Sequence, residues 1–255
     1  MRLATWNVNS IRARTPRLTA WLAVAQPDVL LLQETKVEDH GFPVALFAEH
    51  GYQVVFHGQK SYNGVAIASK SPITDVTLGI ADGEFSDDQA RVIAGTIDGV
   101  RVASLYCPNG QAPGTDKYAY KLAWFAAAQR WLARHDRALP IVLGGDWNVA
   151  PGDLDVYDPN KWAGKIMCSQ PERDGLAALC AWGLDDAFRR LNPEAREYSW
   201  WDYRGAWFWK NEGLRIDHFL VDPTIAARMT GCMIDRDARK GQDASDHAPV
   251  ILTLS

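Results

Sequence analysis

The stretch Ile141-Val142-Leu143-Gly144-Gly145-Asp146-Trp147-Asn148 carries the most information about this chain. A short apolar run, typical of a buried strand, ends at two glycines and is followed by a carboxylate and a carboxamide two residues apart. Because positions i and i+2 of a strand point to the same side, Asp146 and Asn148 are expected to project together, with Trp147 pointing into the core. Asp, Asn and Gly also form ordinary turns, so this motif alone leaves a turn and a binding site as alternatives.

The composition is that of a globular protein. Hydrophobic residues make up 47% of the 255 residues and charged residues 23%, which excludes a disordered or membrane-embedded chain. A net charge of -4 argues against a passive DNA coat. The four cysteines lack metal-binding spacing, and neither a signal peptide nor a membrane span is recognisable. We therefore expect a single domain over residues 1–255 in an intracellular, cytoplasmic protein.

Apolar runs and helical patterns predict a mixed architecture. Strand-like runs follow each other directly in 52–68 and 90–106, which implies antiparallel hairpins. Helices are predicted from Pro16, over 118–134 and over 172–182. This spacing argues against a parallel barrel or a dinucleotide-binding fold and favours sheets packed face to face with helices outside. The predicted strands are 3–6, 29–32, 54–56, 65–68, 92–97, 102–106, 141–143, 216–221 and 250–254.

Polar residues lie at the ends of several other predicted strands. Asn7 follows the first strand and Glu34 the second, Asp217 lies at the start of a later strand, and Asp246 and His247 precede the last one. Each alone is explained by a turn or a solvated charge. Together they match the place where α/β enzymes carry their chemistry, at the ends of strands.

The chemistry that this set fits is phosphodiester hydrolysis. An anionic phosphate repels hydroxide, so catalysis needs positive charge on the phosphate oxygens and a positioned, deprotonated water. Mg²⁺ takes oxygen ligands of the kind present here, whereas zinc and iron prefer other donors. A histidine can donate to the phosphate if a carboxylate holds its other nitrogen, and Asp217 with His247 can form that pair.

These motifs resemble the exonuclease III branch of the apurinic/apyrimidinic endonucleases, within the endonuclease/exonuclease/phosphatase superfamily. The resemblance covers essentially the whole chain and implies an α/β sandwich, with two mixed, mostly antiparallel sheets in four layers. The stretches that carry it are Trp6-Asn7-Val8-Asn9, Pro27-Asp28-Val29, Leu32-Gln33-Glu34-Thr35-Lys36, His57-Gly58-Gln59-Lys60, Tyr62-Asn63-Gly64-Val65-Ala66, Arg91-Val92-Ile93, Tyr106-Cys107-Pro108-Asn109-Gly110, Gly145-Asp146-Trp147-Asn148, Gly213-Leu214-Arg215-Ile216-Asp217 and Ser245-Asp246-His247-Ala248-Pro249.

The resemblance implies a role for each polar residue at the strand ends. Glu34 would be the main metal ligand, with Asn7 and Asp246 in or next to the metal shell. The metal would be Mg²⁺, for which Mn²⁺ can substitute. Asp146 would deprotonate the attacking water and Asn148 would help to hold water and phosphate; these two are also the candidates for a second metal site.

Two further residues would contact the phosphate. His247, oriented by Asp217, would bond the scissile phosphate. The hydroxyl of Tyr106 would lie on the phosphate or on the leaving group.

The resemblance also implies residues that bind DNA, which are Tyr62, Arg91, Asn109, Lys117 and Lys121. A solvated surface charge is the alternative for each lysine. Phosphate contacts position a duplex without reading its sequence, as a damage-processing enzyme requires.

An aromatic stretch over residues 198–210 completes the candidate substrate site. Trp200 and Leu214 fall where the family builds an apolar pocket for a flipped abasic sugar. Trp207, Phe208 and Trp209 are not part of the family pattern; they either wedge into DNA or form a small core under their loop.

The sequence therefore predicts a Mg²⁺-dependent DNA-repair phosphodiesterase. It is expected to cut duplex DNA on the 5′ side of abasic sites and to process 3′ ends as a phosphodiesterase, phosphatase and 3′→5′ exonuclease, as a monomer with no membrane partner. The alternatives are a phosphodiesterase for lipid headgroups or small phosphate esters, a DNA-binding protein with a decayed site, and a lyase using Lys210.

Overall fold

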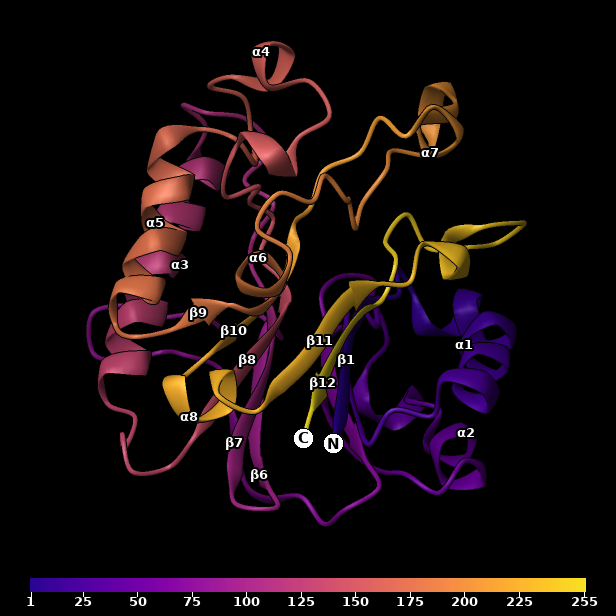
Figure 1. Ribbon diagram of the computed structural model, residues 1–255. Helices are drawn as coiled ribbons and strands as arrows, with labels where there is room; N and C mark the ends of the chain where they lie inside the picture. Colours follow the sequence, from indigo (N-terminus) through magenta and orange to yellow (C-terminus); the bar gives the residue numbers. More distant parts are fainter.

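Two six-stranded β-sheets form the centre of the protein. The computed structural model describes residues 1–255, and Figure 1 follows them from the N-terminus in indigo to the C-terminus in yellow. The strand orders are β11-β12-β1-β2-β4-β3 and β5-β6-β7-β8-β10-β9. The strands are β1 (Arg2–Asn7), β2 (Val29–Gln33), β3 (Gln53–His57), β4 (Val65–Ser69), β5 (Thr74–Leu78), β6 (Val92–Ile97), β7 (Val100–Tyr106), β8 (Ile141–Asp146), β9 (Asp185–Asp186), β10 (Asp217–Val221), β11 (Met229–Ile234) and β12 (Val250–Leu254).

Both sheets are mixed and mostly antiparallel, as predicted. The pairs β1–β2 and β7–β8 are parallel, and the other pairs are antiparallel. The predicted antiparallel pairing within 52–68 and 90–106 is confirmed by β3–β4 and β6–β7. The prediction omitted β5, β9 and β11. All five residues of β5 are exposed, and β9 has only two residues, so neither has the apolar run on which strand prediction depends.

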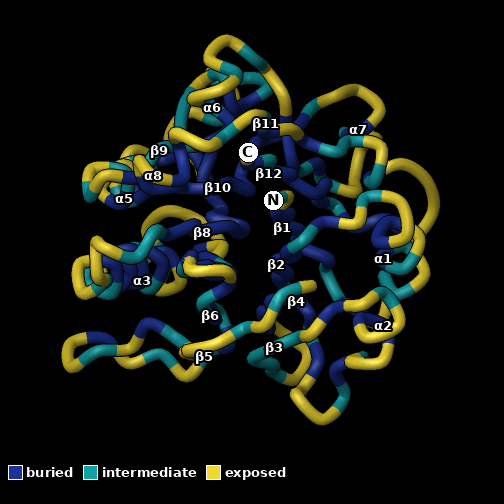
Figure 2. Tube along the Cα trace, turned by 60° about the horizontal axis from the view of Figure 1, so that its bottom comes forward, coloured by how far each residue is buried: buried dark blue, intermediate teal, exposed yellow.

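Helices cover the outer faces of the sheets and produce the predicted four layers (Figures 1 and 2). Helices α1 (Ile11–Ala25) and α2 (Val44–Glu49) pack on the first sheet, and α3 (Asp116–Ala133) and α5 (Gln170–Ala181) on the second. No helix combines the length and the apolar character needed to cross a membrane. The short helices are η1 (Asp39–Gly41), η2 (Asp153–Asp155), α4 (Pro159–Trp162), α6 (Ala187–Leu191), η3 (Arg204–Ala206), α7 (Trp207–Lys210), α8 (Pro223–Ala226) and η4 (Arg236–Arg239).

The predicted start of the first helix was wrong. Helix α1 begins at Ile11, after Ser10, whose side chain accepts a hydrogen bond from the backbone N–H of Ala13, and Pro16 lies inside the helix. An N-cap serine satisfies one of the free N–H groups of the first turn, so it determines the start more strongly than the proline does.

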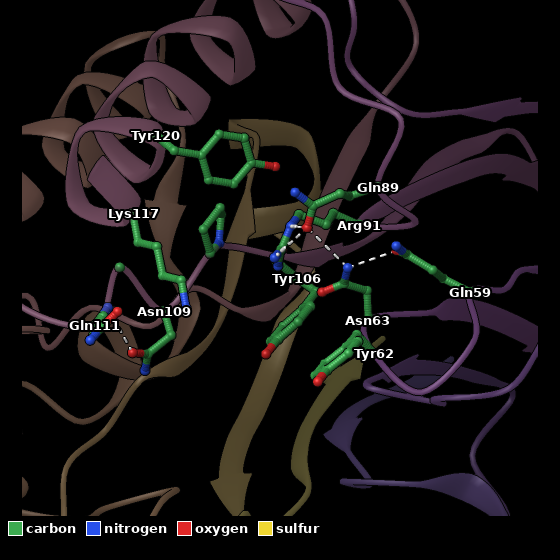
Figure 3. A pocket seen from close by; sticks show the side chains of 12 residues that line it. Gln59, Tyr62, Asn63, Gln89, Arg91, Tyr106, Asn109, Gln111, Lys117 and Tyr120 are labelled. Atoms are coloured by element: carbon green, nitrogen blue, oxygen red, sulfur yellow. Dashed lines mark hydrogen bonds between the residues drawn. The ribbon is translucent and has the colours of Figure 1, made fainter. Parts of the chain in front are cut away.

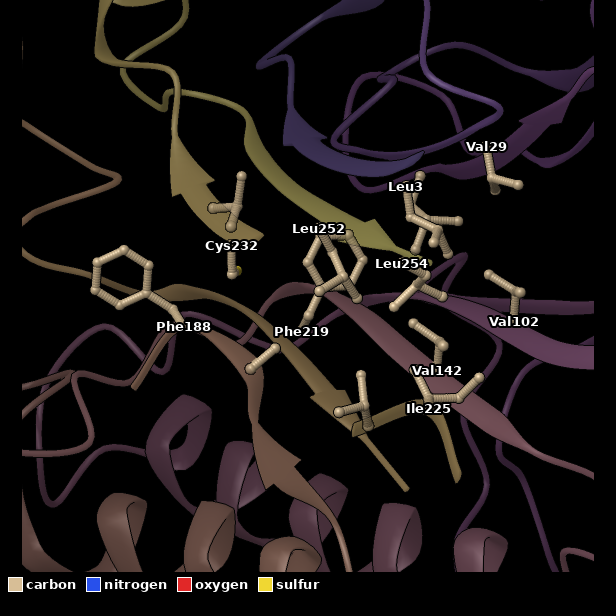
Figure 4. Close-up of a cluster of buried hydrophobic side chains, with 14 of the residues drawn as sticks. Leu3, Val29, Val102, Val142, Phe188, Phe219, Ile225, Cys232, Leu252 and Leu254 are labelled. Carbon is tan, nitrogen blue, oxygen red and sulfur yellow. The ribbon is translucent and has the colours of Figure 1, made fainter. Parts of the chain in front are cut away.

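The main apolar core lies between the two sheets (Figure 4). The prediction that strand β8 ends before its two glycines was wrong, because the strand continues to Asp146. A Cβ atom on Gly144 would lie 2.6 Å from Leu31 of the other sheet and 2.6 Å from Phe219, and one on Gly145 would lie 2.0 Å from the carbonyl oxygen of Leu105. The two glycines are therefore needed because neighbouring atoms approach β8 closely.

Candidate active site

The polar residues predicted at strand ends converge at one end of the two sheets. Asn7 closes β1, Glu34 follows β2, and Asp146 closes β8 directly opposite Asp217, the first residue of β10. Asn7 Nδ2 donates to Glu34 Oε1 at 2.7 Å and to Asp146 Oδ2 at 2.8 Å. A single buried amide therefore joins residues of both sheets.

The motif Asp146-Trp147-Asn148 is both a turn and a part of this site. The backbone N–H of Asn148 donates to Asp146 Oδ1 at 2.9 Å, and Asn148 has a φ of 50° in the left-handed region. Glu34 is left-handed too, with a φ of 52°, and such strained backbone clusters at functional sites. Trp147 points into the core as predicted, fully buried, with its Nε1 donating to the carbonyl of His218 at 3.2 Å.

His247 lies between two carboxylates. Its Nδ1 is 2.9 Å from Asp217 Oδ2 and its Nε2 is 3.7 Å from Asp146 Oδ2, so the predicted pairing of Asp217 with His247 is confirmed. Asp217 Oδ2 also accepts a hydrogen bond from Ser199 Oγ at 2.6 Å. The carboxylate of Asp217 thus fixes the imidazole with Nδ1 protonated and leaves Nε2 facing Asp146.

Burial and neighbouring charges change the proton affinities in the site. Burial, together with the charges of Asp217 and Glu34, raises the pKa of Asp146 to about 7. Burial acts to lower the pKa of His247, but the charges of Asp217 and Asp146 outweigh it and raise this pKa to about 10. Burial, together with the negative charges of Glu34 and Asp146, raises the pKa of Tyr106 well above its usual value. The site therefore combines a protonated imidazole, a neutral phenol and a carboxylate that exchanges its proton near neutral pH.

The donor atoms in the site suit a hard cation. Glu34, Asp146 and His247 each offer a ligand atom, and these atoms lie within 4.8 Å of one another. The hydrogen bond between Nδ1 of His247 and Asp217 leaves only Nε2 of the imidazole facing Asp146. The carboxylates already attract one cation, because Lys36 Nζ lies 2.7 Å from Glu34 Oε2. The carboxylates of Glu34 and Asp146, held together by the amide N–H group of Asn7, offer oxygen ligands that a divalent cation with a preference for oxygen would accept.

Asp246 lies beside this set of donors. Its Oδ1 accepts a hydrogen bond from Asn9 Nδ2 at 2.9 Å and its Oδ2 accepts one from Trp200 Nε1 at 3.0 Å. Lys36 Nζ donates to Asn9 Oδ1 at 2.5 Å. Asp246 is therefore linked through Asn9 and Lys36 to Glu34.

The predicted DNA contact of Lys121 was wrong. Lys121 is completely buried, so its ammonium group is not accessible to DNA. It donates to the carbonyl oxygens of Asn148 at 2.7 Å and Asn109 at 3.2 Å, and it forms a buried ion pair with Glu172. A buried charge is stable only with partners of this kind. The amphipathic pattern of the helix does not show which of its lysines has such partners. Lys121 ties the Asn148 turn and the Asn109 loop to helix α5.

The other four predicted DNA-binding residues lie together around one cavity. Tyr62, Arg91, Asn109 and Lys117 line a polar cavity of about 600 Å³ that also contains Tyr106 (Figure 3). Tyr62 is 70% exposed, whereas Arg91 is held over the Tyr106 ring with its guanidinium carbon 4.9 Å from the ring centroid. Asn109 Nδ2 donates to Asn148 Oδ1 at 3.1 Å. The cavity therefore adjoins the predicted catalytic residues.

The predicted apolar pocket is only partly accessible. Trp200 is half-buried and forms an isolated bridge with His247, but Leu214 is completely buried behind it and cannot line a pocket. The three aromatic residues of α7 differ from one another. Phe208 belongs to the core, Trp207 packs edge-on against Trp200 with ring centroids 6.1 Å apart, and Trp209 is 70% exposed.

Two residues of the site were missed from the sequence. Ser199 orients Asp217, and Glu172 neutralises Lys121. Glu172 also accepts hydrogen bonds from the N–H groups of Met167 at 2.9 Å and Ser169 at 3.1 Å. The Ser169-to-Glu172 capping box was a readable signal for the latter, whereas no local pattern marks Ser199.

Comparisons with known proteins agree with this geometry. Residues 4–247 match the Endonuclease/Exonuclease/phosphatase family. Exodeoxyribonuclease III of Haemophilus influenzae is 38% identical and aligns over 98% of either chain. A structure of the 3′ phosphatase NExo from Neisseria bound to product DNA hairpin has a TM-score of 0.95 and 44% identity over 100% of this chain and 99% of that one. An AP endonuclease from Archaeoglobus fulgidus has a TM-score of 0.95 and 36% identity with the same coverage. The chain therefore belongs to the Endonuclease/Exonuclease/phosphatase family.

Proposed function

We propose that this protein is a metal-dependent DNA-repair phosphodiesterase that acts as a monomeric single domain. It cuts duplex DNA on the 5′ side of abasic sites and removes phosphate, sugar fragments and nucleotides from 3′ ends. The observation that carries the proposal is the position of His247 between Asp217 and Asp146, beside Glu34 and Asn7. The relatives named as an exodeoxyribonuclease, a 3′ phosphatase and an AP endonuclease support both kinds of activity.

Glu34 would be the main ligand of Mg²⁺, or of Mn²⁺ in its place, since its carboxylate supplies the oxygen donors that such an ion requires. Asn7, whose Nδ2 donates to Glu34 and Asp146, would hold these carboxylates next to the ion. The bound ion would supply positive charge at the phosphate oxygens. Asp246 would support this group through Asn9.

The protein's own residues would move the protons. Asp146, whose pKa is raised to about 7 mainly by burial, accepts a proton from the attacking water. Asn148, whose backbone N–H donates to Asp146 Oδ1, would help to hold the water and the phosphate. His247 stays protonated and donates from Nε2 to a phosphate oxygen, while Asp217 holds its orientation. Tyr106 keeps its proton because burial raises its pKa, so its hydroxyl donates to the phosphate or to the leaving oxygen.

The cavity beside the site gives the proposed DNA contacts. Tyr62, Arg91, Asn109 and Lys117 line it with donors and one exposed ring, which suits a sugar-phosphate backbone. Trp200, which forms a backbone bridge with His247, would offer its aromatic ring to a deoxyribose without a base.

The test is a comparison of cleavage rates under one set of conditions with Mg²⁺. The substrates are a duplex with an abasic analogue, a duplex with a 3′-phosphate at a nick, a recessed undamaged duplex, and bis(p-nitrophenyl) phosphate. We expect the damaged duplexes to be cut much faster than the small phosphodiester, and excess EDTA to stop every reaction. Faster turnover of the small ester than of any DNA would refute the assignment to DNA.

A further inference from the structure

The imidazole of His218 is completely buried in β10 and takes no part in the proposed proton transfers. Strand β10 pairs with β8, which carries the Asp146 turn at its end (Figure 1). The ring Nε2 of His218 lies 2.8 Å from the carbonyl oxygen of Val149, and its main-chain carbonyl accepts a hydrogen bond from Trp147 Nε1 at 3.2 Å. His218 therefore contacts the residue before Asn148 and the residue after it.

Arg215 determines which ring nitrogen of His218 carries the proton. Its Nη1 lies 2.8 Å from Nδ1 of His218. A guanidinium group only donates hydrogen bonds, so Nδ1 must accept this one. The proton of the imidazole is therefore on Nε2, which donates to the carbonyl of Val149. Burial and the positive charge of Arg215 lower the pKa of His218, so the ring is neutral at neutral pH.

Two carboxylates hold Arg215 in this orientation. Its Nε donates to Asp155 Oδ1 at 2.7 Å, and its Nη1 and Nη2 donate to the two oxygens of Asp186 at 3.0 and 2.7 Å. A second cation, Arg189, donates from Nη2 to Asp155 Oδ1 at 2.7 Å. Because a bidentate pair fixes the plane of the guanidinium group, the direction of the His218 ring is set by a rigid group of charges.

The main chain at Asn148 needs external support. Its φ of 50° lies in the left-handed region, which is unfavourable for a residue with a side chain. The carbonyl of Asn148 accepts a hydrogen bond from Lys121 Nζ at 2.7 Å, and the next carbonyl, that of Val149, accepts the one from His218. Strained backbone persists only where its surroundings over-determine it. Two buried side chains, one from α3 and one from β10, thus hold two consecutive carbonyls of this turn.

We propose that His218 is a positioning residue for the cleavage reaction: by donating from Nε2 to the Val149 carbonyl, it holds Asn148 and Asp146 in the geometry in which they handle water and phosphate. The proposal rests on the proposed function, which supplies the roles of these two residues. His218 is completely buried, so it acts only through the turn. A displacement of about 1 Å at a reacting group can lower a rate by a factor on the order of 10². Loss of this hydrogen bond should therefore slow cleavage and leave DNA binding unchanged.

Two substitutions of His218 separate positioning from stability. The amide group of asparagine is as many bonds from Cα as Nδ1 of histidine, and the amide group of glutamine is as many bonds from Cα as Nε2. His218→Asn therefore keeps a partner for Arg215 and loses the bond to Val149, whereas His218→Gln keeps the bond to Val149 and loses the one to Arg215. Each variant lacks one buried hydrogen bond, so we expect similar decreases in melting temperature.

The first measurement is single-turnover cleavage of an abasic duplex with Mg²⁺, together with the Kd for the same duplex in EDTA. We expect the rate of His218→Asn to fall on the order of 10- to 100-fold with an unchanged Kd, and His218→Gln to retain most of the wild-type rate. The matched control is His135→Asn, which removes a bond from a ring Nε2 to the Leu139 carbonyl, before the start of β8. That control should cleave at the wild-type rate. Equal rates for the two His218 variants would overturn the proposal.

Hydrogen exchange of the metal-free protein, measured by mass spectrometry, gives a readout that does not depend on cleavage. The backbone N–H groups of Trp147, Asn148 and Ala150 are all hydrogen-bonded, to the Ile216 carbonyl, to Asp146 Oδ1 and to the Met167 carbonyl respectively. We expect them to exchange faster in His218→Asn than in His218→Gln, with equal exchange elsewhere in the chain. Equal exchange of this segment in the two variants would overturn the proposal.

If either variant does not fold, nitrogen NMR of the histidine-labelled wild-type protein decides. We expect a neutral His218 ring with its proton on Nε2, and a ring protonated on Nδ1 would overturn the proposal. Failure of the wild-type protein to cut any DNA would instead refute the proposed function, and hydrogen exchange would still show whether His218 holds the turn.

Discussion

Replacement of Lys121 by methionine distinguishes a buried ion pair from a DNA contact. The substitution leaves the carboxylate of Glu172 without a cation, in a place where its other partners are Ser169 and the N–H of Met167. Removing one member of a buried ion pair costs about 3–5 kcal/mol of unfolding free energy. For a chain of this size each kcal/mol corresponds to roughly 2–4 °C, so we expect the melting temperature to fall by about 6–20 °C.

The same helix provides the matched control. Lys117 lies one turn before Lys121 and is exposed in the cavity, so Lys117→Met should change the unfolding free energy by less than about 0.5 kcal/mol. Replacing both members of the pair, Lys121→Met with Glu172→Met, should restore most of the lost stability because no unpaired charge remains.

Circular dichroism melts and urea titrations measure the stabilities, and anisotropy at low temperature measures DNA binding. The assignment of Lys121 to a buried pair is refuted if Lys121→Met melts like the wild type while its salt dependence of DNA binding falls by about one unit of slope.

Three more substitutions test other parts of the structure. Asp217→Asn should lower kcat by a factor on the order of 10³–10⁴ with unchanged DNA affinity, because His247 loses the acceptor that fixes its tautomer; a single-turnover rate equal to the wild type would exclude this role. Gly145→Ala should destabilise the protein by about 3 kcal/mol or more, seen in urea unfolding, since its Cβ would meet the Leu105 carbonyl, whereas Gly231→Ala, with its nearest contact at 4.0 Å, should be neutral. Burial acts to raise the pKa of Asp186, but the charge of Arg215 outweighs it and lowers this pKa to about 2. The carboxylate should therefore contribute about 2 kcal/mol to the free energy of unfolding above pH 4 and lose that contribution between pH 4 and pH 2. Arg215→Met should abolish this pH dependence of unfolding, and its persistence would contradict the assignment.

The sequence was sufficient to predict the strands that lie in the middle of the sheets, because their apolar runs are continuous. It failed at the exposed strand β5 and at the start of α1, where a serine cap rather than Pro16 determines the boundary. It also ended β8 too early, because Gly144 and Gly145 resemble a turn in sequence but serve close packing in the structure.

A residue of the candidate site could be predicted from the sequence only where it directly follows or precedes a strand with a recognisable apolar run. Asn7, Glu34 and Asp146 satisfy that condition, and the structure places them in contact. Burial cannot be predicted for a charged side chain on a helix, since Lys117 and Lys121 occur in the same pattern and only tertiary packing separates them. The support of Asp217 by Ser199 depends on two loops meeting in space, which no local pattern encodes.

The most direct test of the proposed active site is the single-turnover cleavage of an abasic duplex by Asp146→Asn, with enzyme in excess over DNA and Mg²⁺ present. The substitution keeps the shape of the side chain but replaces the carboxylate by an amide, which cannot accept the proton of water. We therefore predict that DNA binding persists while the cleavage rate falls by several orders of magnitude. Cleavage at the wild-type rate by this variant would contradict the assignment of Asp146 as the base and, with it, the proposed mechanism.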